Sequence, residues 1–313
     1  MAREVRAGLC RTPRSIPPKY FYDDTGSALF DAICMLPEYY LTRAESALLE
    51  AHGDAIVEAA LAAALVEIGS GMARKTAPLL GAICARCAAP TYVPFDIAPE
   101  AIVQSASPLL DAYPALRVTG LVGDFARDCG KLAEAAPASR GPRLFAFLGS
   151  TIGNLDEREA PALVAAVASL MNENDRFLLG VDRVKAPAVL HAAYNDARGL
   201  TAAFNRNVLR VVARELDGHV DVDAFAHVAF YDPERERIEM RLRATRPVAM
   251  TLRAADVHVE LARDETILTE ISRKFTRESA ERTLREGGMD LVDWRTGPDD
   301  AFALCVARAS RPL

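Results

Sequence analysis

The chain of 313 residues lacks several features that would assign it to particular classes of protein. Its apolar-leaning runs, such as Ala55 to Ile68, are interrupted by acidic residues (here Glu58 and Glu67), so we expect no transmembrane span and no membrane partner. The arginines near its start are not followed by an apolar segment, so no secretory signal is expected. Basic residues alternate with acidic ones and the formal net charge is −6, which argues against nucleic-acid binding.

Cysteine is sparse and scattered along the chain. Six cysteines in a sequence of this length indicate a reducing compartment rather than a disulfide framework, so we expect a cytoplasmic protein. Cys84 and Cys87 form a C-x-x-C pair, but they lie in an apolar stretch of helical spacing with no second Cys or His pair near it. We therefore expect neither a metal site nor a redox site there.

Two phosphate-binding motifs are also missing. No G-x-x-x-x-G-K-[ST] sequence occurs, which argues against a Walker-type site. Residues Leu65 to Lys75, LVEIGSGMARK, have the pattern of a buried strand, a tight turn and a helix start, which holds nucleotide-like ligands in open α/β sheets. Gly69 and Gly71 allow φ > 0 and close approach of a ligand, but the third glycine of a dinucleotide fingerprint is absent. Glu67 repels phosphate and favours a cationic ligand such as the sulfonium of S-adenosylmethionine.

Strand and helix patterns alternate from about residue 43 onward. Five apolar runs of strand length are separated by helical segments. This alternation predicts an α/β protein with a parallel, doubly wound sheet covered on both faces. The five expected strands are Leu65 to Ile68, Thr91 to Asp96, Arg117 to Val122, Arg143 to Leu148 and Arg176 to Val181.

The pattern changes after about residue 184. A long helical stretch through Leu216 is followed by a predicted hairpin, Phe225 to Phe230 and Arg237 to Arg243, whose charged face we expect to be solvated. A later helix, Arg277 to Glu286, and two final strands would rejoin the main sheet. Residues 184–274 are therefore expected to form an insertion.

Polar residues follow successive strands at the edge where such sheets bind ligands. Asp96 ends the second strand, where an acidic side chain can accept both ribose hydroxyls. Asp124 and Phe125 end the third, where a carboxylate can accept an adenine amino proton and a ring can pack nearby. Asn154 follows the fourth; it either caps a helix or offers its amide to a substrate carboxylate, and periodicity does not distinguish these two roles.

Several longer strings occur in order over nearly the whole chain: PPKYFYDDTGSALFDAI, LPEYYLTRAE, LVEIGSG, PFDI, GDF, FLGSTIGNL, TAAFNRNVL, RIEMRLRA and LTEISRKF. Together they resemble the family of histidine-specific S-adenosylmethionine-dependent N-methyltransferases, whose best-known members make trimethylhistidine (hercynine) at the start of ergothioneine biosynthesis. The resemblance implies a Rossmann-like class I methyltransferase domain, expected at residues 44–183 with 275–313. It also implies an α+β histidine-binding domain, expected at residues 1–43 with 184–274.

The resemblance assigns site residues motif by motif. The residues implied to contact S-adenosylmethionine are Gly69, Lys75, Asp96, Asp124 and Phe125. Those implied to bind histidine are Tyr22, Tyr39, Asn154, Tyr194, Met240, Glu270 and Ser272. Amide and phenol groups suit the substrate carboxylate, and a carboxylate with a hydroxyl suits the two ring nitrogens. Without the resemblance, the tyrosines and Met240 are ordinary packing residues.

The implied reaction is in-line transfer of methyl groups to the α-amine of L-histidine. It needs positioning more than side-chain chemistry, so we expect no covalent nucleophile and no metal, with Tyr39 as the candidate for assistance. We expect a monomer and treat the five histidines as surface or core residues. Three alternatives stay open at this point: a related N-methyltransferase acting on another amino acid such as a tryptophan derivative, a nicotinamide-dependent oxidoreductase, and a non-catalytic S-adenosylmethionine sensor.

Overall fold

The structure is a computed structural model that describes residues 1–73, 75–136 and 141–310. Arg74, in the expected glycine turn, and residues 311–313, in the expected methyltransferase domain, lie outside the described residues. Within the described ranges, no helix is both long enough and apolar enough to cross a membrane.

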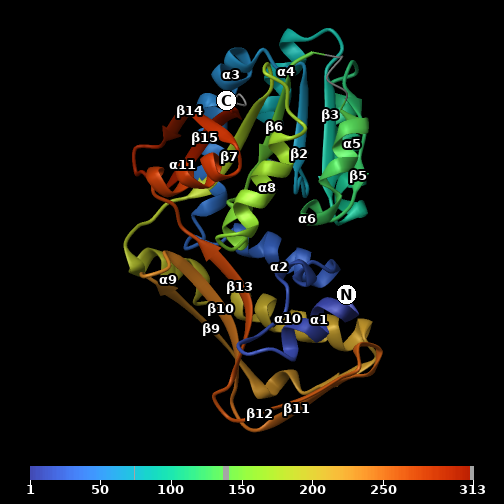
Figure 1. Ribbon diagram of the computed structural model, residues 1–313, viewed down its shortest axis with the longest axis vertical. Coiled ribbons are helices and arrows are strands. Elements are labelled where there is room, and N and C mark those ends of the chain that lie inside the picture. The colour runs from blue at the N-terminus through green and yellow to red at the C-terminus, as the bar shows by residue number, and fades with distance from the viewer. Residues whose placement is uncertain (74, 137–140, 311–313) are drawn as a thin grey trace. The chain divides into compact units, whose positions relative to one another are not determined.

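The chain divides into two compact units, each made of two separate segments (Figure 1). What we call the sheet unit comprises Leu41–Val184 and Lys274–Leu313. What we call the insertion unit comprises Met1–Tyr40 and Lys185–Arg273. The insertion unit therefore combines the start of the chain with a segment inserted between two parts of the sheet unit.

The sheet unit is built on one sheet with the strand order β14-β15-β7-β6-β2-β3-β4, in which β5 also pairs with β3. The strands from β7 to β4 and β5 are parallel, whereas β15 is antiparallel to β7 and to β14. The strands are β2 (Ala64–Ile68), β3 (Thr91–Asp96), β4 (Arg117–Val118), β5 (Leu121–Val122), β6 (Arg143–Phe147), β7 (Arg176–Asp182), β14 (Met289–Thr296) and β15 (Phe302–Ala309). The helices are α3 (Leu41–Ala60), α4 (Ala77–Arg86), α5 (Pro99–Ala112), α6 (Phe125–Asp128), η2 (Cys129–Lys131), α7 (Leu132–Ala135), η4 (Thr151–Asn154), α8 (Glu159–Ala168) and α11 (Arg277–Glu286).

Helices cover both faces of this sheet, because its central strands are apolar on both sides. All of β2 is buried. Leu65 packs among residues of α3 and α4 on one face, and Val66 packs among residues of α8 and α11 on the other. At the start of α11, the side chains of Thr276 and Ser279 each accept a hydrogen bond from the other's backbone N–H. The expected α/β fold with a doubly wound sheet is confirmed.

The third expected strand, Arg117–Val122, is wrong as a single strand. It is divided into β4 and β5, which pair with different parts of β3. Between them, Gly120 approaches α5 so closely that a Cβ there would lie 2.5 Å from the side chain of Ile102. A glycine at a close approach of this kind interrupts a strand, which explains the division.

The insertion unit holds two sheets, with orders β1-β13-β10-β9 and β12-β11-β8. The expected hairpin is confirmed as β9 and β10, which are antiparallel and pair Asp232 with Arg237. The strands are β1 (Arg14–Ser15), β8 (Gly218–Val220), β9 (Phe225–Asp232), β10 (Arg237–Ala244), β11 (Val248–Leu252), β12 (Val257–Leu261) and β13 (Thr266–Arg273). The helices are α1 (Ala2–Leu9), η1 (Pro18–Phe21), α2 (Asp24–Cys34), α9 (Pro187–Tyr194), α10 (Leu200–Glu215), η5 (Val222–Ala224) and η6 (Arg253–Ala255).

The expectation that the charged face of this hairpin is solvated is wrong for Glu239, which is 1% exposed. Its carboxylate accepts hydrogen bonds from Arg237 at 2.5 Å and from Arg241 at 2.7 Å. Burial raises the pKa of Glu239, but the bonds from the two arginines outweigh it and hold the pKa below its usual value. Arg237, Glu239 and Arg241 project from the same face of the hairpin, and the two long arginine side chains cover the carboxylate. The alternating pattern could not indicate that this face is covered.

The long helical stretch expected after residue 184 is interrupted. α9 ends at Tyr194 and α10 begins at Leu200. Between them, the Asp196 carboxylate accepts hydrogen bonds from the backbone N–H groups of Leu200 at 2.9 Å and Thr201 at 2.8 Å. A side chain that satisfies these donors favours a new helix start at this point. The break leaves Tyr194 at a helix end.

Candidate functional site

The glycine turn after β2 has the conformation that the sequence predicts. Gly69 and Gly71 have φ of +68° and +48°, a region that side chains with a Cβ rarely adopt. The Gly69 N–H donates to the Phe95 carbonyl at 2.8 Å, and the Gly71 N–H donates to the Asp96 carboxylate at 2.8 Å. The turn is therefore attached to the end of β3, beside the place where the strand order reverses between β2 and β6.

Asp96 lies at the carboxyl end of β3, as expected. Its second carboxylate oxygen accepts a hydrogen bond from the Ala98 N–H at 3.0 Å. Its backbone carbonyl accepts from the Gly123 N–H at 2.9 Å, which brings the loop of Asp124 to the same edge of the sheet. The backbone N–H of Asp124 donates in turn to Asp128 at 3.0 Å. The structure thus places Gly69, Asp96 and Asp124 on neighbouring loops of one unit.

The ring of Phe125 packs edge-on against Phe147, with centroids 5.3 Å apart. Phe147 is fully buried at the end of β6, and a Cβ on Gly69 would lie 3.7 Å from its ring. Phe147 therefore joins the loop after β2 to the loop after β5. Sequence reasoning did not single it out, because a buried strand residue carries no signal that separates a ligand-side ring from a core ring.

Lys75 is held by a residue that the sequence reasoning missed. Glu45 of α3 is fully buried, accepts a hydrogen bond from the Gly149 N–H at 2.6 Å, and forms an ion pair with Lys75. This carboxylate joins the loop after β2 to the loop after β6. The available signal was its spacing: Glu45 shares a helical face with the buried residues Leu41 and Leu48, where an apolar residue is expected.

The expectation that Glu67 faces a cationic ligand is not supported by its geometry. Glu67 is 3% exposed, and its two oxygens accept hydrogen bonds from Thr76 at 2.6 Å and Tyr92 at 2.5 Å. Burial raises the pKa of this carboxyl group to about 7, although both hydroxyls favour its ionised form. Glu67 alternates with Val66 along β2 and shares the face of Leu65, beneath α3 and α4. It holds the start of α4 in place.

Asn154 ends the short helix η4, which follows β6. The loop before this helix is anchored where the Ser150 hydroxyl accepts a hydrogen bond from the Asp182 N–H at 2.9 Å. Asn154 does not cap α8, which begins at Glu159. The helix-cap interpretation of Asn154 is therefore wrong, and the residue belongs to the same sheet edge as the glycine turn.

In the insertion unit, three of the residues expected to bind histidine form one contact chain. The rings of Tyr39 and Tyr194 lie edge to face, with centroids 6.3 Å apart. The Tyr194 hydroxyl donates to the Ser272 Oγ at 2.8 Å. Burial, followed by the neighbouring Tyr194, raises the pKa of Tyr39 well above its usual value. Tyr39 is therefore a neutral phenol at physiological pH, able to hydrogen-bond but not to act as a phenolate base.

Met240 and Glu270 are brought together by strand register. They are paired across β10 and β13, and Met240 is 1% exposed. Next to this pair the register shifts, because Arg241 pairs with Leu268 and leaves Thr269 as an extra residue on β13. A bulge of this kind re-aims side chains and is common beside functional sites. Met240, Glu270 and Ser272 are thus collected on two neighbouring strands.

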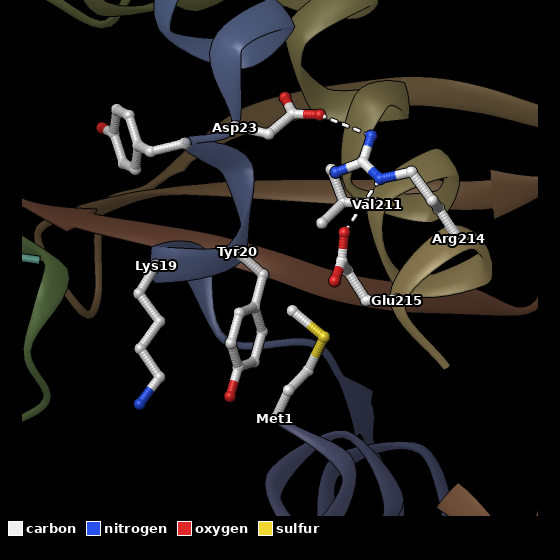
Figure 2. Close-up of a pocket in the computed structure, with 8 residues that line it drawn as sticks. Met1, Lys19, Tyr20, Asp23, Val211, Arg214 and Glu215 are labelled. Atoms are coloured by element: carbon white, nitrogen blue, oxygen red, sulfur yellow. Dashed lines mark hydrogen bonds and ion pairs between the residues drawn. The ribbon is translucent and has the colours of Figure 1, made fainter. Parts of the chain in front are cut away.

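Tyr22 lies at the margin of this group and is 41% exposed. Its ring packs edge-on against Phe30 and Phe204, each at a centroid distance of 5.7 Å. Tyr22 also lines a hollow of about 210 Å³. Figure 2 shows the side chains around this hollow, where Arg214 bonds to Asp23. Among the described residues that line this hollow, Tyr22 alone belongs to the residues expected to bind histidine, so the hollow does not collect that group.

Comparison with known proteins agrees with the resemblance found in the sequence. Residues 1–309 match the model of a family described as histidine-specific methyltransferase, SAM-dependent. A histidine N-alpha-methyltransferase of Mycolicibacterium smegmatis is 43% identical over 308 residues, which cover 98% of this chain and 94% of that protein. Its counterpart in Mycobacterium tuberculosis is 41% identical over 307 residues, with the same coverage of 98% and 94%. Ergothioneine biosynthesis protein 1 of Neurospora crassa is 29% identical over 91% of this chain and 32% of its own length.

Proposed function

Because the chain belongs to the family of histidine-specific, S-adenosylmethionine-dependent methyltransferases, we propose that it trimethylates the α-amino group of L-histidine to hercynine, the first step of ergothioneine biosynthesis. The observation that carries this proposal is the near-complete match to histidine N-alpha-methyltransferases, at 43% identity over 98% of the chain. The grouping of Tyr194, Ser272, Glu270 and Met240 in one unit supports it.

The residues of the sheet unit fit the methyl donor. We propose that the glycine turn receives the donor at Gly69 and that Asp96 accepts its ribose hydroxyls. A carboxylate offers about four lone-pair sites, so the two bonds from Gly71 and Ala98 leave one site on each oxygen. Asp124 and Phe125 would hold the adenine, with the ring steadied by its contact to Phe147. When bound, S-adenosylmethionine supplies a sulfonium methyl group, and its leaving group is a neutral thioether.

The insertion unit supplies most of the groups for the amino acid. Asn154 and Tyr194 would donate to the histidine carboxylate, and Glu270 with Ser272 would bond to the two ring nitrogens. Ser272 already accepts a hydrogen bond from Tyr194, so its own hydroxyl proton is directed elsewhere. The attacking amine must be unprotonated. We propose that the Tyr39 hydroxyl assists by orienting this amine through a hydrogen bond.

Purified protein incubated with S-adenosylmethionine and L-histidine is expected to yield mono-, di- and trimethylhistidine in sequence, measured by mass spectrometry. Tryptophan, 4-substituted tryptophan derivatives and tyrosine are offered as alternative acceptors, each in a separate reaction. A protein that methylates one of these and leaves histidine unchanged would contradict the substrate assignment and favour a related N-methyltransferase. Binding of S-adenosylmethionine without turnover of any acceptor would favour a sensor.

Glu270→Ala tests the acceptor half of the site. Removing the carboxylate that bonds to the ring is expected to weaken histidine binding by about 100-fold or more, because a charge-assisted bond is lost. The affinity for S-adenosylmethionine should change by less than about twofold. The control is Glu265→Ala at the exposed end of the same segment, which should leave both affinities unchanged.

We also propose that the protein acts in the cytoplasm, which its six free cysteines support. We propose a monomeric state as well. Light scattering coupled to size-exclusion chromatography tests the latter, and a mass of twice the 33.9 kDa of the chain would contradict it.

A further inference from the structure

Asn205, on α10, is fully buried and makes a hydrogen bond with every polar atom of its side chain. Its Nδ2 donates to the Arg241 carbonyl at 3.1 Å and lies 2.8 Å from the Nδ1 of His227. Its Oδ1 accepts from the Thr269 hydroxyl at 2.6 Å. This single amide therefore connects α10 to strands β9, β10 and β13.

The protons on Asn205 and His227 are determined by the backbone carbonyls of Arg241 and Tyr194, which can only accept. Because Nδ2 of Asn205 must donate to the Arg241 carbonyl, the same NH₂ group also donates to His227, whose Nδ1 must then be unprotonated. The His227 Nε2 lies 2.9 Å from the Tyr194 carbonyl and must carry the proton. His227 is thus a neutral imidazole in the Nε2–H form.

Each end of the network reaches a residue that the proposed function uses. The Tyr194 carbonyl is held by His227, while the hydroxyl of the same tyrosine donates to Ser272. On the other side, Thr269 is the extra residue of the β-bulge, and its hydroxyl lies 3.0 Å from the Met240 carbonyl. Thr269 also directly precedes Glu270. The network therefore links the end of α9 to the bulge from which the ring-binding residues project.

We propose that Asn205 and His227 are positioning residues for the histidine-binding group, which fix Tyr194 relative to Ser272 and Glu270 through the Nε2–H imidazole. This inference rests on the proposed function and adds two residues to which the resemblance assigns no role. Neither side chain touches the acceptor; both act by holding groups that do. An active-site group misplaced by about 1 Å costs up to about 100-fold in rate, so supports of this kind have a measurable effect.

The electrostatic surroundings favour the neutral ring. Burial lowers the pKa of His227 below 6.5, although the Tyr194 carbonyl and the nearby Asp196 favour the charged form, and Arg206 opposes it. Protonation at Nδ1 would place an N–H group against the NH₂ of Asn205. The Asn205 amide cannot turn over to relieve this, because its oxygen would then face the Arg241 carbonyl.

His227→Ala is expected to raise the Kd for histidine about tenfold or more, while the Kd for S-adenosylmethionine stays within about twofold. His227→Gln should restore much of this loss, because its Nε2–H can still donate to the Tyr194 carbonyl. The matched control is His191→Ala: this exposed imidazole also joins α9 to β9, accepting from the Tyr231 N–H, but it lies outside the network. Isothermal titration calorimetry measures both affinities, and chemical denaturation checks folding.

Asn205→Asp provides a second, nearly isosteric test. A carboxylate cannot donate to the Arg241 carbonyl, and it favours a proton on His227. Its kcat/KM for histidine should therefore fall, with a pH profile displaced from that of the wild type. Arg210→Gln, an exposed substitution on the same helix with the same change of net charge, should keep the wild-type profile. Nitrogen-15 NMR of labelled histidine should show the Nε2–H form of His227 at pH 7.

The outcomes separate this inference from the function on which it rests. Wild-type protein that does not bind histidine overturns both. Wild-type binding with His227→Ala equal to His191→Ala, or an Nδ1–H or doubly protonated His227 at pH 7, overturns the inference alone. A selective loss of histidine affinity in His227→Ala, with rescue by His227→Gln, supports it.

Discussion

Glu67 carries a buried carboxyl group whose protonation is linked to folding. Burial raises its pKa to about 7 from 4.5, so the folded state binds a proton more tightly than the unfolded state between these pH values. The Glu67 contribution to stability is therefore fully present below pH 4.5 and is lost as the pH rises through 7. Because glutamine does not titrate, we expect the unfolding free energy of Glu67→Gln to increase relative to that of the wild type as the pH rises through this window.

Urea denaturation of both proteins from pH 4.5 to pH 8 checks this prediction. Glu58→Gln, an exposed change in α3, is the control and should show no such trend. A constant difference between wild type and Glu67→Gln across the range would contradict the raised pKa.

The same residue shows what single positions in a sequence can and cannot reveal. A glutamate before two glycines indicates a loop at the ligand edge, and that edge is where Gly69 and Asp96 lie. The direction of the Glu67 side chain depends on strand alternation, which places it with Leu65. Which helices cover that face is a tertiary property, and so the hydroxyls of Thr76 and Tyr92 could not be anticipated.

At the scale of elements, the loops after β2 and β6 are joined by one buried carboxylate of α3. Glu45 bonds to the Gly149 backbone and to the Lys75 ammonium. Glu45→Gln breaks the ion pair between this buried carboxylate and Lys75, whose side chain is partly exposed, so we expect a loss of stability of up to about 3 kcal/mol. Because Lys75 is expected to contact the cofactor, the Kd for S-adenosylmethionine should also rise, by about tenfold.

Chemical denaturation measures the loss of stability, and calorimetry measures the Kd for S-adenosylmethionine. Glu50→Gln on the exposed side of α3 is the matched control. Unchanged cofactor affinity, together with the expected loss of stability, would show that the Glu45 ion pair supports the fold and not the cofactor loop.

Elements also differ in how well their pattern predicts them. The hairpin β9–β10 is confirmed because alternation over eight residues in each strand fixes which residues share a face. Alternation alone does not show that the face with Glu239 is covered by its own arginines. In the same way, helical periodicity runs through residues 195–199, but the cap formed by Asp196 ends one helix and begins another.

At the scale of the whole molecule, the parallel sheet is predictable because a helix separates successive strands. The helix carries the chain back to the end of the sheet where the previous strand began, so the next strand runs in the same direction. The residues expected to bind histidine are a different case. Tyr194 ends a helix, whereas Glu270 and Ser272 follow a bulge in a distant strand, and no local pattern joins them. Their grouping was expected from the family resemblance, and Asn205 and His227, which hold them, belong to no motif that names their role.

The division into two units predicts how ligand affinities separate. Asp96→Asn, in the sheet unit, should raise the Kd for S-adenosylmethionine by about 10- to 100-fold through loss of charge-assisted bonds, with histidine affinity unchanged. Ser272→Ala, in the insertion unit, should raise the Kd for histidine by up to about tenfold, with cofactor affinity unchanged. Each ligand is titrated in the absence of the other, so that coupling between them does not enter.

Asn154→Ala decides how strictly ligands follow the units, because Asn154 belongs to the sheet unit yet is expected to bind the histidine carboxylate. A selective loss of histidine affinity would mean that both units contribute to the acceptor. A selective loss of cofactor affinity would assign Asn154 to the donor and leave the acceptor to the insertion unit. Equal losses of both affinities in Asp96→Asn and in Ser272→Ala would contradict the separation itself.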